Sequence, residues 1–246
     1  MMTKLNLINL SLDQINEWIG GKLVFNSDNI NIDKSYKNKT NTNIENIIIK
    51  NINTNSKTIK PGDLFIALKG ENHDAIKFAS SAVENGATAV MVNEDAYNKL
   101  IKTKKQNTNN ALGNTFDTTN INIPVIKVKD TTIALGDLAR NYKSNKSLKT
   151  VAITGSSGKT TTRNMLTSIC NQNSNTLSPE KNYNNEVGLP LTLLNLTDKH
   201  ELAVLEMGAT KPGDIKYLMN IATPDVTLIT NIGPAHLTTM GGMDGV

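Results

Sequence analysis

The chain has 246 residues, of which 38% are hydrophobic and 4% aromatic, and its formal net charge is +4 at pH 7. This length allows one large or two ordinary domains, and the hydrophobic content can supply a core. We expect no nucleic-acid groove, because no cluster of lysine and arginine alternates with aromatic residues. We expect a cytoplasmic chain without membrane insertion, because no stretch reaches about 18 apolar residues and the N-terminus lacks an apolar signal region.

The N-terminal part of the chain begins with a short predicted helix. We expect this helix over Ser11–Ile19, with Ser11 as its N-cap and Gly20 ending it. The polar, asparagine-rich residues 26–46 predict strand fragments joined by loops, and a strand resumes at Ile47–Ile49.

Residues 55–94 predict a small α/β domain. Leu64–Leu68 has the composition of a buried strand, Ile76–Asn85 repeats apolar residues at helical spacing, and Ala89–Val92 predicts a further strand. The polar residues Ser56 and Lys57 precede the first of these strands, and Gly70 lies in the turn after it. Such residues are either ligand contacts or ordinary loop residues, and their pattern alone leaves both interpretations open.

The next segment contains the predicted domain boundary. Residues 102–122 are polar and of low complexity, which predicts an insertion. A strand is expected over Pro124–Val128 and a helix over Thr131–Lys143. The helix positions available to a core are Ile133, Leu135, Leu138, Ala139 and Tyr142. The charged linker after this helix places the boundary between domains at residues 1–145 and 146–246.

The most informative stretch is TVAITGSSGKTTTR, residues 150–163. A β-branched apolar run leads into a tight glycine loop, and the following residues favour a helix with apolar side chains at Met165, Leu166 and Ile169. In this layout, backbone N–H groups and a helix N-terminus converge on a phosphate. Lys159 can reach the outer phosphates of a nucleoside triphosphate, and the Thr160 hydroxyl is placed to join a Mg²⁺ shell.

The glycine loop also has a plainer interpretation. The motif is a shorter G-x-x-G-K-T form of the phosphate loop, because Ile153 stands where the strict motif has its first glycine. A glycine-rich turn that only starts a helix would have the same glycines. Such a turn needs neither a lysine nor a hydroxyl after its last glycine, so the phosphate interpretation is favoured. The single cysteine, Cys170, lies on the helix and is expected to be a small buried hydrophobe.

Strand and helix patterns keep alternating after the loop. Glu201–Glu206 predicts a buried strand, Pro212–Ile221 a helix and Asp225–Thr230 another strand. The predicted fold class is therefore α/β, with a small N-terminal α/β substrate domain followed by a partial, parallel-sheet ATPase domain of the phosphate-loop type. Ligands gather at the carboxyl ends of such strands.

Polar residues at these strand ends are candidates for chemistry. Glu206 closes an apolar strand level with the phosphate loop, where a Mg²⁺ ligand would lie, although a solvated strand end would also place a glutamate there. Asn231 and His236 follow the last strand and could equally form its turn. Asn182, Asn184, Asn185 and Glu186 crowd before an apolar helix, which helix capping alone does not explain.

With these residues in view, the chain resembles the Mur ligase family. The resemblance runs in the family's order from residue 55 to the last residue, through the segments PGDLFIALKGENHD, TGSSGKTTTR, NYNNEVGLPLTLLNL, AVLEMGATKPGDIKYL and PDVTLITNIGPAHL. The third segment and the final AHL favour the branch that joins D-alanyl-D-alanine to UDP-N-acetylmuramoyl-tripeptide. The resemblance implies a ligase of peptidoglycan precursor synthesis, and hence a part in cell-wall biogenesis, cell shape, cell division and the cell cycle.

The resemblance also implies roles for individual residues, with ATP and Mg²⁺ as cofactors. The residues implied to bind ATP are Gly155, Ser156, Ser157, Gly158, Lys159, Thr160, Thr161 and Asn231. The implied catalytic residues are Lys159, Asn184, Asn185, Glu186, Glu206 and His236, and those serving Mg²⁺ are Thr160, Glu206 and His236. The implied contacts to the uridine diphosphate end of the substrate are Asn55, Ser56 and Lys57, with Gly70 in the nearby turn. In the family, ATP phosphorylates the tripeptide carboxylate, and the amine of the dipeptide then attacks the acyl phosphate.

The chain departs from the family pattern in several places. Asn55-Ser56-Lys57 stands where the family usually has Asp-Ser-Arg, so a bidentate contact becomes a point charge. Asp74-Ala75-Ile76 replaces Asp-Gly-His, and Arg163 replaces a common lysine. Family members continue beyond the position of Val246, through the rest of the central domain and a third domain that receives the amino substrate. We therefore expect little or no ligase activity from this chain alone.

Two other functions remain open from the sequence. One is a non-catalytic remnant of the ligase that holds a nucleotide or UDP-sugar. The other is an unrelated phosphate-loop kinase or GTPase, which would need its own acceptor motif; none is visible in the sequence. We expect a monomer that takes small-molecule substrates.

Overall fold

The computed structural model describes residues 8–24, 47–70, 74–106, 123–179 and 182–245. It forms two compact units, Leu7–Ala134 and a second unit that includes Leu135–Val246, which we call the N-terminal and C-terminal units. The division falls within the helix α5 (Thr131–Ser144). The expected domain boundary at residue 145 stays a prediction.

The N-terminal unit is built on a five-stranded sheet with the strand order β2-β7-β6-β5-β4. The strands are β2 (Lys22–Val24), β4 (Asn51–Asn53), β5 (Asp63–Ile66), β6 (Ala89–Asn93) and β7 (Val125–Val128). Strands β4 to β7 are parallel, and β2 pairs antiparallel with β7 at one edge. A separate antiparallel pair joins β1 (Leu10–Ser11) to β3 (Ile48–Ile49). The central strands β5 and β6 are buried along their whole length, because helices and loops cover both faces of a parallel sheet.

Helices connect the strands of this unit. They are α1 (Leu12–Ile19), the 3₁₀ helices η3 (Ser56–Thr58) and η4 (Ala75–Phe78), α3 (Ala79–Glu84) and α4 (Glu94–Gln106). The predicted cap of α1 is confirmed: the backbone N–H of Gln14 donates to the Ser11 hydroxyl at 3.1 Å, and Gly20 ends the helix with φ at 59°.

Helix α4 is absent from the prediction, and its last residues overlap the start of the predicted insertion, which stays a prediction. Residues 102–106 belong to α4, while residues 107–122 and the asparagine-rich residues 26–46 lie outside the described part of the chain. Asn93 caps the helix, because its side-chain oxygen accepts the N–H of Ala96 at 3.0 Å. Its buried Tyr97 and half-buried Leu100 and Ile101 supply a narrow apolar stripe that the surrounding lysines conceal in the sequence.

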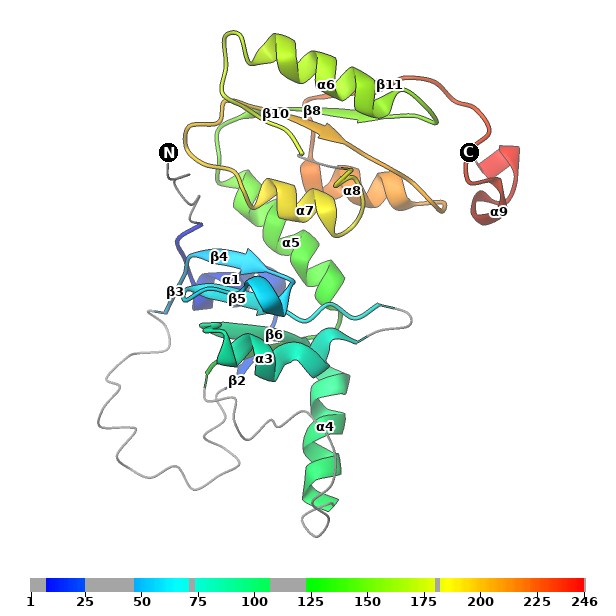
Figure 1. The fold of residues 1–246 in the computed structure, drawn as a ribbon. Coiled ribbons are helices and arrows are strands. Elements are labelled where there is room, and N and C mark those ends of the chain that lie inside the picture. Colours follow the sequence, from blue (N-terminus) through cyan, green and yellow to red (C-terminus); the bar gives the residue numbers. More distant parts are fainter. Residues whose placement is uncertain (1–7, 25–46, 71–73, 107–122, 180–181, 246) are drawn as a thin grey trace. The chain divides into compact units, whose positions relative to one another are not determined.

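The C-terminal unit contains a parallel four-stranded sheet with the order β11-β8-β10-β9. Its strands are β8 (Lys149–Thr154), β9 (Thr176–Leu177), β10 (Leu202–Glu206) and β11 (Val226–Ile229). Figure 1 shows α6 (Lys159–Cys170) on one face of this sheet and α7 (Gly188–Leu193) and α8 (Asp214–Ala222) on the other. The chain then forms the short α9 (Leu237–Met240) and η6 (Met243–Gly245). The predicted α/β class with a parallel sheet is confirmed.

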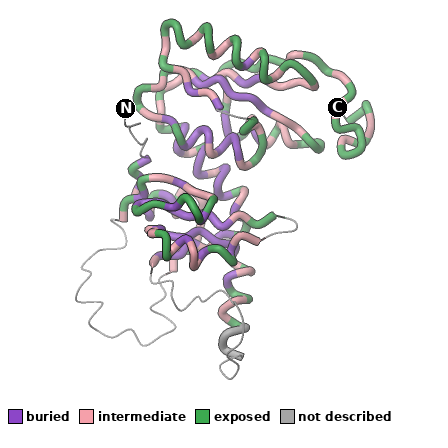
Figure 2. The backbone as a smooth tube through the Cα atoms, viewed as in Figure 1, coloured by how far each residue is buried: buried purple, intermediate pink, exposed green. Residues whose placement is uncertain are grey.

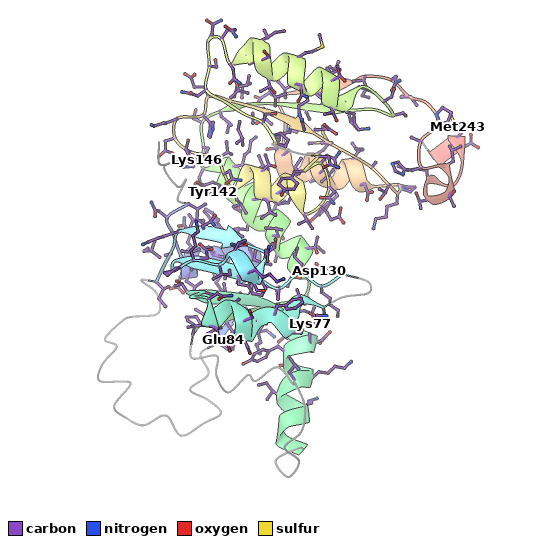
Figure 3. The ribbon with its side chains drawn as sticks, in the orientation of Figure 1. Lys77, Glu84, Asp130, Tyr142, Lys146 and Met243 are labelled. Atoms are coloured by element: carbon purple, nitrogen blue, oxygen red, sulfur yellow. The ribbon has the colours of Figure 1, made fainter. Side chains whose placement is uncertain are left out.

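Burial differs sharply between the strands of this sheet. Figure 2 shows the two central strands, β8 and β10, as largely buried, while β11 is exposed. On β11, Val226 is 57% exposed and Ile229 is 56% exposed. The carboxyl end of β8 therefore offers a rigid base for a site, since its backbone pairs with β10 on one side and with β11 on the other, and the carboxyl end of β10 is fixed by its pairing with β8.

Several apolar residues of the predicted helices are exposed. Ile133 is exposed, because it lies outside the i, i+3, i+4, i+7 stripe of α5 formed by Leu135, Leu138, Ala139 and Tyr142, which are buried. Met165 and Ile169 are also exposed, since the buried stripe of α6 runs through Arg163 and the half-buried Leu166, Thr167 and Cys170. Cys170 is therefore half-buried and not fully buried as expected. Among the described residues, no helix combines the length and apolar character needed to cross a membrane.

Candidate active site

The phosphate loop joins β8 to α6 in the conformation that its glycines predict. Gly155 has φ at 133° and Gly158 has φ at 78°, both in the region that favours glycine, and Gly158 is the N-cap of α6. The ammonium of Lys159 turns back over the loop and donates to the carbonyl of Gly155 at 2.5 Å. Because a neutral carbonyl is a weaker partner for an ammonium than an anion is, an anion in the loop would compete effectively for Lys159.

Glu206 is the buried centre of the site. It ends β10, and its side chain is 2% exposed. One carboxylate oxygen accepts the Thr160 hydroxyl at 2.9 Å, and the other accepts the Asn184 side-chain amide at 2.8 Å. The structure thus brings together three residues that the sequence predicted separately, from α6, from the segment before α7 and from a strand end.

Arg163 completes this cluster and was not among the predicted site residues. One guanidinium nitrogen lies 3.3 Å from the Glu206 oxygen that Thr160 also contacts, and the Arg163 side chain is 6% exposed. The rest of the guanidinium donates to Asn164 at 2.8 and 3.2 Å. A charged residue on the inner stripe of a helix is the signal that could have found it, because a buried arginine needs a carboxylate partner.

Asn185 and Glu186, which follow Asn184, differ from it in their contacts. The Asn185 side-chain oxygen accepts the N–H of Gly188 at 2.8 Å, so Asn185 caps the start of α7. Glu186 is exposed. The segment is fixed to β10 by the backbone as well, since Gly208 N–H donates to the Asn184 carbonyl at 2.8 Å.

Asn231 contacts the phosphate loop directly. Its side-chain oxygen accepts the N–H of Ser157 at 2.9 Å, and its amide nitrogen donates to the Ser157 hydroxyl at 2.8 Å. Its backbone carbonyl accepts the N–H of Ser156 at 3.1 Å. Asn231, which the sequence predicts to contact the nucleotide, is therefore hydrogen-bonded to the phosphate loop in this structure.

A cavity of about 290 Å³ opens beside the loop. Gly155, Ser156 and Lys159 form its polar end, and its other walls are mostly apolar. The remaining lining residues are Thr154, Ala209, Ile215, Ile229, Asn231, Ile232, Ala235, His236 and Met240. His236 is one of these lining residues; it is exposed and forms the N-cap of α9 with φ at 50°. A polar phosphate end beside an apolar chamber suits a nucleotide.

The predicted metal set is only partly assembled. In the described part of the chain, no hydrogen bond or ion pair joins His236 to Glu206, and no group of three His, Cys, Asp or Glu side chains is placed to hold a metal. Thr160 nevertheless fits Mg²⁺. Its hydroxyl hydrogen is given to Glu206, so its lone pairs remain for a cation that prefers oxygen ligands and keeps several waters.

The predicted uridine contacts lie at one edge of the N-terminal sheet. Residues 55–57 follow β4 and Gly70 follows β5, and since these strands are parallel, both loops lie beyond the same ends. The Asn55 side chain accepts the N–H of Lys57 at 3.1 Å and so caps η3. Ser56 is 7% exposed, whereas Lys57 and Gly70 are exposed.

The family profile described as "Mur ligase family, catalytic domain" matches residues 48–143, and the profile "Mur ligase middle domain" matches residues 153–246. The chain belongs to the Mur ligase family. The resemblance predicted from the sequence is thereby confirmed, and the phosphate loop and Glu206 lie within the Mur ligase middle domain.

Individual Mur ligases agree with this placement. The UDP-N-acetylmuramoyl-tripeptide–D-alanyl-D-alanine ligase of Haemophilus influenzae is 38% identical over 206 residues, which cover 82% of this chain and 40% of the relative. The same ligase of Escherichia coli K12 is 36% identical, with 81% and 39% covered. The chain thus spans about 40% of the length of these curated relatives.

Solved structures of Mur ligases share the fold. A crystal structure of MurF from Acinetobacter baumannii has a TM-score of 0.75 and 35% identity, and the match covers 98% of this chain and 45% of that one. MurF from Thermotoga maritima, solved in complex with ADP, has a TM-score of 0.64 and 33% identity, with 81% and 42% covered.

Proposed function

We propose that this chain supplies the muramoyl-substrate and ATP-binding parts of an ATP-dependent amide ligase. The reaction would join D-alanyl-D-alanine to UDP-N-acetylmuramoyl-tripeptide through an acyl phosphate, as the names of its relatives indicate for them. The observation that carries the proposal is the contact of the buried Glu206 carboxylate with Thr160 and Asn184 beside the phosphate loop. A glycine turn that only starts a helix does not need a buried carboxylate at its first hydroxyl.

The residues of the loop would act mainly by position and charge. The free backbone N–H groups at the start of α6 and the Lys159 ammonium would hold the phosphates of ATP and offset charge that shifts during phosphoryl transfer. Mg²⁺, when bound, would supply further charge neutralisation. Thr160 would be its direct oxygen ligand, while Glu206 accepts the Thr160 hydrogen and keeps the lone pairs turned outward. The ADP complex of the Thermotoga maritima relative supports a nucleotide in this family's site.

Asn184, Asn185 and Glu186 would approach the reacting groups from the segment before α7. Asn184 links the segment to Glu206, and Asn185 fixes the start of α7, so the exposed Glu186 carboxylate is carried on a well-anchored backbone. This arrangement suits the second half-reaction, in which an acyl phosphate and an amine must be brought together in one geometry. His236 would face the nucleotide or its cation from the cavity wall.

The N-terminal unit would bind the UDP-muramoyl substrate. Lys57 and the buried Ser56 lie with Gly70 beyond the same strand ends, where parallel sheets place their ligands. A lysine attracts a diphosphate as a point charge. We further propose that the protein acts as a cytoplasmic monomer in cell-wall synthesis, with no nucleic-acid partner.

Titration calorimetry with Mg²⁺-ATP tests the ATP-binding half of this proposal. We expect binding by the chain and its loss in Lys159→Ala, with Lys199→Ala as a control that removes an exposed lysine from the turn before β10, at the opposite end of the parallel strands from the loop. A folded chain that binds no Mg²⁺-ATP, or equal binding by the chain and the Lys159→Ala variant, would contradict the proposal. UDP-N-acetylmuramoyl-tripeptide in place of ATP tests the N-terminal unit, and Lys57→Ala should weaken its binding.

A further inference from the structure

The turn after β11, residues Thr230–Gly233, holds the phosphate loop through side chains as well as backbone. Besides the bonds of Asn231, the Thr230 hydroxyl donates to the Ser157 carbonyl at 2.6 Å. The Ser156 hydroxyl donates to the Gly233 carbonyl at 2.7 Å and accepts the Gly233 N–H at 2.9 Å. We call these bonds, with those of Asn231 to Ser156 and Ser157, the loop–turn network.

The network uses groups that a phosphate would otherwise need. Each backbone N–H has one hydrogen, and those of Ser156 and Ser157 are both donated to Asn231. A phosphate in this loop is therefore left with the N–H groups from Gly158 onward and with Lys159. Hydrogen bonds to the turn at Thr230–Gly233 therefore hold the phosphate loop in this shape before any nucleotide binds.

Gly155 shows independently that the loop is built against this turn. A Cβ atom at Gly155 would overlap the Thr230 hydroxyl and would lie 2.9 Å from the Asn231 carbonyl oxygen. The φ of 133° at Gly155 also excludes an ordinary side chain. Loop and turn therefore lie too close together for a side chain at position 155.

We propose that Asn231 is a positioning residue for the phosphate loop. It acts through Ser157, whose N–H and hydroxyl it binds with the two ends of one amide, and it holds the loop open for phosphate before the nucleotide arrives. Its neighbour Ile232 lines the cavity together with Gly155 and Ser156, so the same turn also forms the wall of the chamber beside the phosphates. This inference rests on the nucleotide site proposed above and assigns to Asn231 a role that needs no contact with the nucleotide.

Amide hydrogen exchange of the nucleotide-free chain is the first test. In Asn231→Ala, the Ser157 N–H loses its acceptor, and we expect it to exchange at least about tenfold faster. Asn231→Asp keeps an acceptor oxygen at the same place and should restore most of the protection. Thr227→Val on β11 is the control, because its hydroxyl contacts the Met219 sulfur, at 3.9 Å, and it should leave Ser157 exchange unchanged.

Calorimetry with Mg²⁺-ATP on the same variants is the second test. Asn231→Ala should weaken ATP binding by about tenfold, because the loop must then be ordered on binding. If it weakens ATP binding while Ser157 exchange stays at the wild-type rate, Asn231 contacts the nucleotide directly and the proposal is wrong. Unchanged exchange together with unchanged binding would also overturn it.

Failure of the proposed function and failure of a variant to fold can both be distinguished from failure of this inference. If the unmodified chain binds no ATP, the proposed function fails, while the exchange rates still decide whether Asn231 orders the loop. If Asn231→Ala does not fold, Thr230→Val replaces it, since this variant keeps the side-chain shape and removes only hydroxyl bonds to the loop and to β8. It should raise exchange at Ser156 and Ser157 severalfold, and unchanged exchange there would overturn the network's role.

Discussion

The two regions proposed to bind ligands differ in how their polar groups are held. In the C-terminal unit, Glu206 is tied to Thr160 and Arg163 on α6 and to Asn184 before α7, all far from it in sequence. In the N-terminal unit, Asn55 and Lys57 are held chiefly by residues within a few positions, such as Asn53 and Thr58. The first region is part of the packed core, whereas the second is a local turn. Substitutions should therefore affect stability strongly in the first and weakly in the second.

The largest effect is expected from Arg163→Met. This variant leaves the Glu206 carboxylate buried without its cation, which should lower the free energy of unfolding by about 3–5 kcal/mol. Urea denaturation measures the loss. The matched control is Arg140→Met, which breaks the exposed pair with Asp137 and should cost less than about 1 kcal/mol.

A second substitution distinguishes the buried pair from a simple loss of packing. Adding Glu206→Gln to Arg163→Met removes the unpaired charge, so the double variant should be more stable than Arg163→Met alone. Equal or lower stability of the double variant would mean that the charge is not the cause. The burial of a charge would then not explain why the Glu206 cluster responds more strongly to substitution than the loop at Asn55.

A smaller effect is expected from Asn55→Ala in the N-terminal unit. The variant removes the cap that accepts the Lys57 N–H, which should cost about 1 kcal/mol in unfolding free energy. The neighbouring Lys57→Ala should leave stability within about 0.5 kcal/mol of the unmodified chain, because Lys57 is exposed. Thermal unfolding of both variants checks this order. A loss of several kcal/mol in either would show that this loop is as tightly integrated as the Glu206 cluster.

The same contrast explains what the sequence could predict. Strand, loop and helix around Gly155–Thr160 follow from local patterns, and so does Glu206 at a strand end. Asn184 was found because too many polar residues crowded before α7. Arg163 and the hydrogen bonds of Thr230 escaped prediction, because they depend on which face of α6 meets the sheet and on how β11 lies beside β8. Helix α4 was missed for another reason, since its apolar residues Tyr97, Leu100 and Ile101 form a narrow stripe among lysines, although its cap at Asn93 is a local signal.

The smallest predicted effect concerns pH and lies outside both regions. Burial lowers the pKa of His200, whose Nδ1 accepts the N–H of Thr197 at 3.0 Å in the turn before β10. The folded state therefore binds a proton less readily than the unfolded state. The stability that the neutral ring contributes is fully present above its unfolded pKa of about 6.5, and it is lost as pH falls through that value towards the lower folded pKa.

Replacing the imidazole isolates this dependence. His200→Asn keeps an acceptor for the turn and removes the titration, so its unfolding free energy should fall less between pH 7.5 and pH 5.5 than that of the unmodified chain, working from the reference histidine pKa of about 6.5. Urea denaturation at the two pH values measures the difference. Parallel pH profiles for the two proteins would show that the turn does not hold the His200 ring neutral.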